Sequence, residues 1–214
     1  MTENFSSRLD AVAESIRLSF TEKDAAREKA LPLSREAIRH CSLSIRAIHR
    51  QQFAEAEVEL ARAKTLIDEA EATIDACDEL SNTSFFRDAQ KEYAEGRITL
   101  AIITGKSIPT PGELAVDSAA YLNGMGEVVG ELRRYILDGL RRGDLSRAEE
   151  LLSVMNAIYE MLVTMDFPDG ITGNLRRTTD VVRGILEKTR SDLTLSLQQK
   201  RLEERLGAFN IRLE

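Results

Sequence analysis

The sequence predicts an all-α protein, an antiparallel bundle of six or seven helices. Apolar residues recur at steps of three and four through most of the 214 residues, which is the spacing of a buried helix stripe. Only four prolines interrupt the chain, and no stretch of useful length alternates as a strand would. The length suits one well-buried core, so we expect a single domain over residues 1–214.

The first half of the chain is expected to contain three helices. The first runs from about residue 5 to about residue 51, and Pro32 marks a kink or a fresh start in it because proline lacks an amide donor. The second covers residues 53–80 and the third residues 85–105. The sequence SNTS between them ends one helix and can cap the next.

The second half begins with the longest irregular stretch, residues 106–117, which holds two of the four prolines. A helix over residues 121–138 follows and stops at the sequence RRGD. Another spans about residues 146–164, and the sequence FPDGITGN breaks it. A long last helix is expected from about Leu175 onward. Helices of this length bury each other's apolar stripes in an antiparallel stack.

Charge and cysteine content limit the class of protein. The net charge of −7 argues against a wholly basic nucleic-acid binder, although it allows a local basic face. No run of 18 apolar residues exists, and the N-terminal sequence lacks the apolar core of a signal peptide, so we expect neither a membrane span nor secretion. Cys41 and Cys77 form no CxxC motif, and we expect reduced thiols in a cytoplasmic protein.

Two predicted helices each carry a pair of carboxylates on one face. These pairs are Glu92 with Glu95 and Glu127 with Glu131. Like charges one turn apart repel each other by a few tenths of a kcal/mol, and by more where water is scarce. The pairs are tolerated if they are solvated, with Glu131 paired to Arg134, if some carboxylates are protonated, or if a cation lies among them.

Oxygen-only ligands suit Mg²⁺ or Mn²⁺, and such a cation can activate water and stabilise charge on a phosphoryl oxygen. A di-iron carboxylate site is disfavoured because it needs Glu-x-x-His pairs. The only histidines are His40 and His49, and neither lies three residues after a glutamate. A nucleophilic pair of Cys41 with His40 or His49 has little support, since closeness along one helix is weak evidence and adjacent residues of a helix do not face each other.

Basic residues lie in a narrow sector of the first helix. Arginine is suited to phosphate through its planar fork, while the alternative is a solvated or acid-paired stripe. No aromatic residues alternate with these arginines, so any binding would be mainly to phosphate. The candidate RNA-binding residues, with a second set at the start of the last helix, are Arg35, Arg39, Arg46, His49, Arg50, Arg176 and Arg177.

Four segments in order resemble the translin superfamily, and within it the catalytic branch called translin-associated factor X. They are PLSREAIRHCSLSIRAIHR, QKEYAEG, YLNGMGEVVGELRRYILD and GNLRRTTDVVRGILEKTRSDL, and the resemblance covers about residues 30–195. It implies a seven-helix fold and a hollow shell, here a homo-octamer, in which single-stranded RNA is cut by a metal-dependent ribonuclease. The family's four catalytic acids correspond to Glu92, Glu95, Glu127 and Glu131.

One position departs from the family. The eukaryotic catalytic subunit usually has Asp where this chain has Glu127, and the added methylene can displace a bound metal beyond the tolerance of such sites. We therefore expect a cytoplasmic, Mg²⁺-dependent endoribonuclease, with Mn²⁺ as a possible substitute and a metal-bound water as nucleophile. The alternatives are a non-catalytic translin-like protein that binds single-stranded RNA or DNA, and a helical scaffold without nucleic acid.

Overall fold

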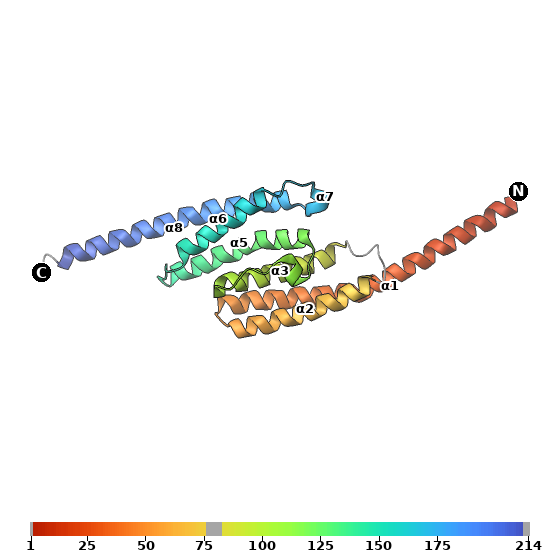
Figure 1. The fold of residues 1–214 in the computed structure, drawn as a ribbon, viewed down its shortest axis with the longest axis horizontal. Helices are drawn as coiled ribbons and strands as arrows, with labels where there is room; N and C mark the ends of the chain where they lie inside the picture. Colours follow the sequence, from red (N-terminus) through yellow and green to blue (C-terminus); the bar gives the residue numbers. More distant parts are fainter. Residues whose placement is uncertain (1, 76–82, 212–214) are drawn as a thin grey trace. The chain divides into compact units, whose positions relative to one another are not determined.

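The structure, a computed structural model, describes the backbone of residues 2–75 and 83–211 and the side chains of residues 5–74 and 83–206. Every regular element in these residues is an α-helix, which confirms the predicted all-α class (Figure 1). Six helices are long and two are single turns. They are α1 (Thr2–His49), α2 (Phe53–Asp75), α3 (Ser84–Thr104), α4 (Pro111–Leu114), α5 (Ser118–Arg141), α6 (Ala148–Val163), α7 (Asp169–Thr172) and α8 (Leu175–Ile211).

The chain divides into two compact units, residues 1–97 and 98–214, and α3 contributes residues to both. The sequence predicted one domain, and that stays a prediction. The expected second helix, residues 53–80, is confirmed as far as Asp75, and its remainder lies outside the described residues, as does Cys77.

In the first unit, α1 and α2 pack side by side in opposite directions (Figure 1). A three-residue turn at 50–52 joins them, with Gln51 in the left-handed region at φ 62°. Leu60, Ile67 and Ile74 of α2 are fully buried and repeat every seven residues, which is one helix stripe. Burial of this stripe within the first unit therefore stabilises the position of α2.

α1 continues through Pro32 without a break, so the expected fresh start of a helix there is wrong, while the expected kink stays a prediction. Proline removes the hydrogen bond to the carbonyl of Glu28, but both residues are exposed, and water can solvate that carbonyl. On the buried side, Ala30 and Ser34 are completely covered, and the Ser34 hydroxyl donates to the Ala30 carbonyl at 3.0 Å. Burial of this face offsets the local cost.

α3 approaches the other two helices of the first unit closely at Gly96. A Cβ atom there would lie 2.7 Å from Cδ2 of Leu60 on α2 and 3.1 Å from Oγ of Ser44 on α1. Both neighbours are buried, so only glycine permits this approach. Gly96 therefore sets how deeply the adjacent residue, Glu95, is placed in the first unit.

The second unit is built on α5, α6 and α8, which pack against one another. The apolar residues that recur at steps of three and four in α5 are Leu122, Met125, Val129, Leu132 and Ile136, and all of them are buried except Leu122, which is half-buried. The predicted irregular stretch before α5 contains the one-turn helix α4, and the predicted break before α8 contains α7. None of the described helices is long and apolar enough to cross a membrane.

Candidate functional site

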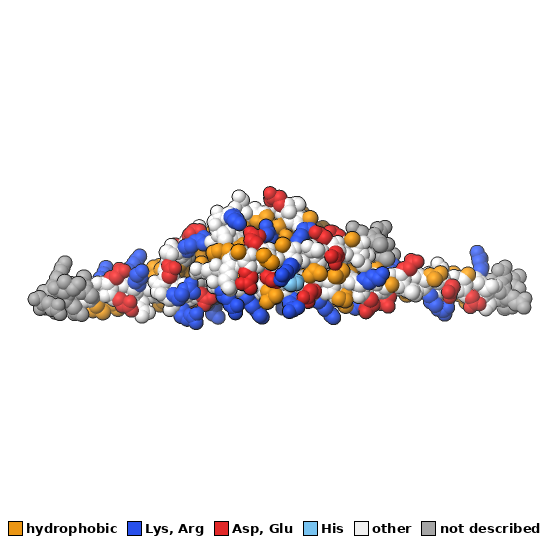
Figure 2. Space-filling view, turned by 90° about the horizontal axis from the view of Figure 1, so that it is seen from below, with side chains coloured by type: hydrophobic (Ala, Val, Ile, Leu, Met, Phe, Trp, Pro, Cys, Tyr) orange, Lys and Arg blue, Asp and Glu red, His pale blue; other side chains and the backbone are white. Residues whose placement is uncertain are grey.

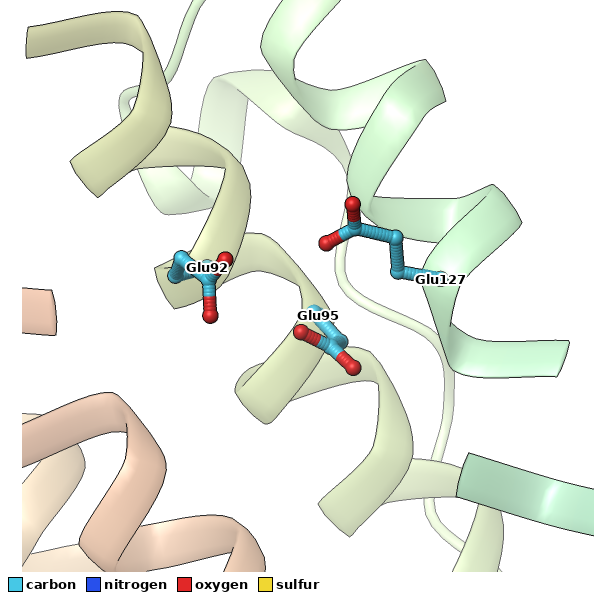
Figure 3. Close-up of side chains that lie close together, drawn as sticks. All are labelled: Glu92, Glu95 and Glu127. Carbon is cyan, nitrogen blue, oxygen red and sulfur yellow. The ribbon is translucent and has the colours of Figure 1, made fainter. Parts of the chain in front are cut away.

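Glu92 and Glu95 form a carboxylate pair on one face of α3. A carboxylate oxygen of one lies within 4.8 Å of a carboxylate oxygen of the other, and the two side chains project from neighbouring turns (Figure 3). Glu92 is half-buried, whereas Glu95 is only 8% exposed. Two anions this close, one of them almost removed from water, need compensation by positive charge or by protonation.

The pair acts electrostatically on the buried thiol of Cys41 and has a lysine at its edge. Cys41 of α1 is buried, and the pKa of its thiol is raised first by that burial and then by the charges of Glu92 and Glu95. Lys91 brings a positive charge to the edge of the pair, because its Nζ lies 3.6 Å from Oε1 of Glu92. An oxygen-only donor set of this kind fits a hard divalent cation such as Mg²⁺ or Mn²⁺.

Glu127 and Glu131 lie one turn apart on α5, and both side chains are half-buried (Figure 3 shows Glu127 on its helix). Nη1 of Arg134 lies 3.6 Å from Oε2 of Glu131, so the ion pair expected from the sequence is confirmed. Arg134 is about half-exposed, and an exposed pair at this distance neutralises the carboxylate only weakly.

The predicted basic face of α1 is on the surface. Arg35, Arg39, Arg46 and Arg50 are all exposed, and His49 is half-buried. Arg39 donates to Oε1 of Glu36 at 2.7 Å, so it is partly neutralised. No ion pair joins the other three arginines to the side chains that the structure describes. Figure 2 shows Lys and Arg side chains interspersed with acidic ones on the face that it views.

Arg176 and Arg177 stand in the first turn of α8 and are both exposed. Like the three unpaired arginines of α1, they form no ion pair with the described side chains. Their guanidinium groups are therefore available to an anion in solution.

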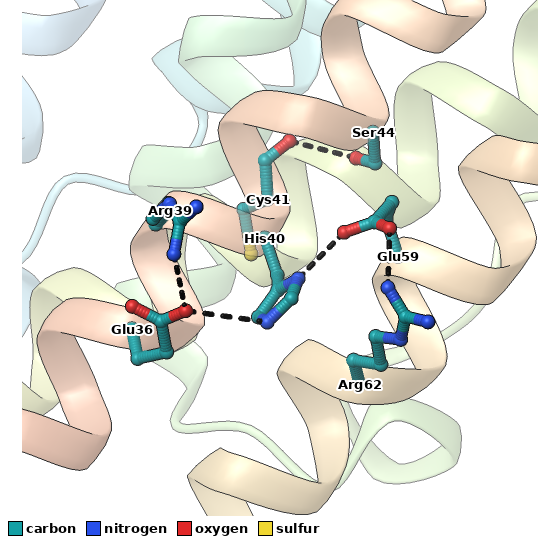
Figure 4. A network of polar contacts seen from close by, with 7 residues as sticks. All are labelled: Glu36, Arg39, His40, Cys41, Ser44, Glu59 and Arg62. Carbon is teal, nitrogen blue, oxygen red and sulfur yellow. Dashed lines mark hydrogen bonds and ion pairs between the residues drawn. The ribbon is translucent and has the colours of Figure 1, made fainter.

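His40 belongs to a polar network that the sequence did not predict. Its Nδ1 atom lies 2.5 Å from Oε2 of Glu59, and Oε1 of Glu59 accepts from Arg62 at 2.8 Å (Figure 4). Its Nε2 atom lies 3.6 Å from Oε1 of Glu36. Because both ring nitrogens face carboxylates and the Cys41 thiol has a raised pKa, a nucleophilic Cys–His pair is excluded in this arrangement.

Two further residues hold the helices that carry the carboxylates. Arg147, just before α6, donates to the carbonyls of Ile103 at 2.6 Å and Ile102 at 3.1 Å, which lie in the last turn of α3. Cations favour helix C-termini, where carbonyls lack partners within the helix. The RRGD sequence predicted the end of α5, shortly before Arg147, but nothing in the sequence indicated the contact between Arg147 and α3.

Asn123 holds α5 in the same way, from within the segment YLNG. Its amide donates to the carbonyl of Thr172 in α7 at 2.8 Å, and its side-chain oxygen accepts from Thr178 in α8 at 2.7 Å. Three elements are joined by this one side chain, four residues before Glu127. The only signal in the sequence was an asparagine within a predicted helix, where this residue type is disfavoured.

Comparisons with known proteins place this fold. No protein-family model matches the chain. A curated relative, the uncharacterized protein MJ0175 of Methanocaldococcus jannaschii, is 32% identical over 196 residues, which cover 89% of this chain and 85% of the relative. The crystal structure of AfC3PO is 36% identical with a TM-score of 0.79, over 89% of this chain and 98% of that one.

The chain belongs to the translin superfamily. A second translin-family structure, the complex of AfC3PO with duplex RNA, is 37% identical with a TM-score of 0.76, over 89% of this chain and 98% of that chain. The structure of apo-NeC3PO is 21% identical with a TM-score of 0.71, over 88% and 96% of the two chains, and shows that the translin fold itself is shared. The roles expected of the four glutamates and of the basic residues stay predictions.

Proposed function

We propose that this translin-family protein is a metal-dependent endoribonuclease that cuts single-stranded RNA, and that it works as a homo-oligomer, an octamer. The observation that carries the proposal is the carboxylate pair of Glu92 and Glu95, in which the second side chain is almost fully buried. Such a pair is costly unless positive charge or protonation compensates it, and a bound cation would supply that charge. The likeness to the AfC3PO–duplex RNA complex supports RNA as the ligand.

We expect Glu127 and Glu131 of α5 to supply the other two carboxylate ligands. A Mg²⁺ or Mn²⁺ ion bound by these carboxylates would lower the pKa of a coordinated water and would stabilise charge on a phosphoryl oxygen. The chain's own contribution is to fix the carboxylates. Gly96 sets the depth of α3, and Asn123 and Arg147 hold the helices on which the acids lie.

The basic residues supply the second part of the proposal, which is substrate binding. Arg35, Arg46 and Arg50 are exposed arginines that lack a described acidic partner. They can form paired hydrogen bonds with phosphate oxygens without reading base sequence. With a net charge of −7, most of the surface repels RNA, so the arginines determine where RNA binds.

A flexible single strand can bend its phosphates toward recessed carboxylates, whereas the phosphates of an A-form duplex are held on a stiff helix. The AfC3PO complex contains duplex RNA, so we expect a duplex to bind this chain as well. We also expect the duplex to be cut more slowly than an unstructured strand.

The test is cleavage of an end-labelled, unstructured RNA by the purified chain in Mg²⁺. Internal fragments should appear, EDTA should stop their formation, and an excess of Mg²⁺ should restore it. Cleavage that continues in EDTA would contradict the metal-dependent reaction. RNA that is bound but never cut, in Mg²⁺ or in Mn²⁺, would instead assign the chain to the non-catalytic, RNA-binding function.

A further inference from the structure

The buried face of α1 follows a regular pattern of positions. Its covered residues recur at steps of three and four, as in one helix of a coiled coil. α2 packs against α1 over this stretch. The buried positions are Ala26, Ala30, Ser34, Ala37, Cys41, Ser44 and Ile48.

The same pattern continues towards the N-terminus without a cover. Counting back from Ala26 in steps of three and four gives residues 23, 19, 16, 12, 9 and 5. Four of these are large apolar side chains, and they are exposed by 48% to 65%. They are Phe5, Leu9, Val12 and Ile16. A helix face that is covered by α2 further along the chain is thus left open over residues 5–23, here named the N-terminal arm.

We propose that the N-terminal arm pairs in antiparallel fashion with the same arm of a second copy of this chain. Residues 5, 12 and 19 take heptad position d, and residues 9, 16 and 23 take position a. Antiparallel pairing about residue 14 places Val12 against Ile16 of the partner subunit and Leu9 against the small Ser19 of the partner subunit. The two Val12–Ile16 pairs therefore form the apolar centre of the seam, and a Leu9–Ser19 pair flanks it on each side.

Charge favours this direction of pairing over the parallel one. Arg8 and Glu22 occupy the flanking position g, and the antiparallel register brings Arg8 beside Glu22 of the partner subunit, twice in the dimer. No ion pair joins either residue to another described side chain. A parallel pair would place Lys23 against its own copy in the seam, where like charges repel. The antiparallel pair places Lys23 opposite Phe5 instead.

This pairing is independent of the proposed ribonuclease reaction, because it uses none of the residues assigned to RNA or metal. An alternative partner for the arm is α8 of a second copy, because Leu195, Leu202 and Leu206 of α8 are also exposed. That face lacks the three-and-four repeat between residues 195 and 202, where Gln198 and Gln199 stand. The apolar repeat of the N-terminal arm therefore matches the same arm of a second copy better than it matches α8.

The test is cross-linking of full-length protein by a short bismaleimide, in a Cys77→Ser background. Ala13→Cys lies beside the two-fold axis, so it should give a covalent dimer as the main product. Ser6→Cys, the matched control, faces residue 20 of the partner subunit and should give at most a tenth as much. No dimer from Ala13→Cys, or equal dimer from both variants, would overturn the antiparallel pairing.

Charge reversal provides a second readout that does not depend on cysteine placement. Arg8→Glu and Glu22→Arg should each lower the yield of the Ala13→Cys dimer at least threefold at low salt, and the double reversal should restore it. Leu202→Asp should leave the yield unchanged. Failure of the double variant to recover, or loss of the dimer in Leu202→Asp, would contradict the pairing, and the latter would indicate α8 of the second copy as the partner. Circular dichroism checks that each variant folds.

Discussion

Nδ1 of His40 on α1 lies 2.5 Å from Oε2 of Glu59 on α2, and this contact joins the two helices of the first unit. Glu59 is almost fully buried and has Arg62 as its second partner. Removal of His40 leaves part of a buried carboxylate without a partner, and such a loss costs about 1–3 kcal/mol. The His40→Ala variant should therefore unfold at a lower urea concentration.

The matched control for His40→Ala is Arg39→Ala on the same helix. Arg39 pairs with Glu36 at 2.7 Å, but both side chains reach solvent. Exposed pairs contribute at most about 1 kcal/mol, so this variant should unfold close to the wild type. Equal stability of the His40→Ala variant and the wild type would show that the buried contact adds nothing.

The sequence could predict those parts of the molecule that depend on local pattern. The spacing of apolar residues predicted most of the buried face of α5 correctly. The spacing of Glu92 and Glu95 likewise predicted that both acids lie on one face of a helix. The outcome at Pro32 was not predictable, because burial of Ala30 and Ser34 against other helices offsets the local cost of proline. The His40–Glu59 contact spans 19 residues, and helical spacing carries no information about it.

Two glycine-to-alanine substitutions distinguish the effect of close packing on the free energy of unfolding from the effect of helix propensity. Gly96→Ala adds a Cβ atom 2.7 Å from Leu60, in a buried contact, and should lower the free energy of unfolding by about 1–3 kcal/mol. Gly130→Ala adds one that meets nothing nearer than Ile185 at 4.0 Å. It should be neutral or raise that free energy by up to about 1 kcal/mol.

Urea unfolding of both glycine variants measures this difference. If Gly96→Ala were as stable as Gly130→Ala, α3 would not be held against Leu60 as closely as the structure indicates. The metal site would then lose one of its proposed supports.

The contact at the end of α3 predicts a dependence on pH. Hydrogen bonds from Arg147 hold the pKa of the Glu150 carboxyl below its ordinary value. A carboxyl with a lowered folded-state pKa stabilises the fold above the unfolded-state pKa, roughly 4.3, and this stabilisation is lost as pH falls through the folded-state value. The Glu150→Gln variant should therefore be less stable than the wild type at pH 7, by a small amount because Glu150 is exposed.

Thermal unfolding from pH 7 down to pH 3 checks the direction of this effect. The difference between the wild type and Glu150→Gln should shrink as the pH falls through the lowered folded-state pKa of Glu150, because the wild-type carboxyl then becomes protonated. A difference that grows on acidification would assign the opposite sign to the interaction.

The arginines of α1 are expected to act through phosphate. The triple variant Arg39→Ala, Arg46→Ala, Arg50→Ala should bind single-stranded RNA more weakly, and its affinity should depend less on salt. Each phosphate contact contributes about 0.7 to the slope of log K against log salt on a single strand, so the slope should fall by about 2. Fluorescence anisotropy between low and moderate salt measures it.

The control for the arginine variants is Arg183→Ala on α8, because Arg183 is exposed and already lies 3.5 Å from Asp180. This variant should keep the wild-type slope. An unchanged slope in the triple variant as well would mean that the basic face of α1 is only a solvated surface.

Glutamine at the proposed cation ligands tests the central claim most directly, because it keeps the size of the side chain and removes its charge. The measurement is the rate of cleavage of an unstructured, end-labelled RNA in Mg²⁺ by the wild type, Glu95→Gln, Glu127→Gln and Glu131→Gln, each checked for fold by circular dichroism. We predict that every variant binds RNA as the wild type does and cuts it at least about tenfold more slowly. Wild-type cleavage by Glu127→Gln or Glu131→Gln would contradict the assignment of these carboxylates to a metal-dependent site.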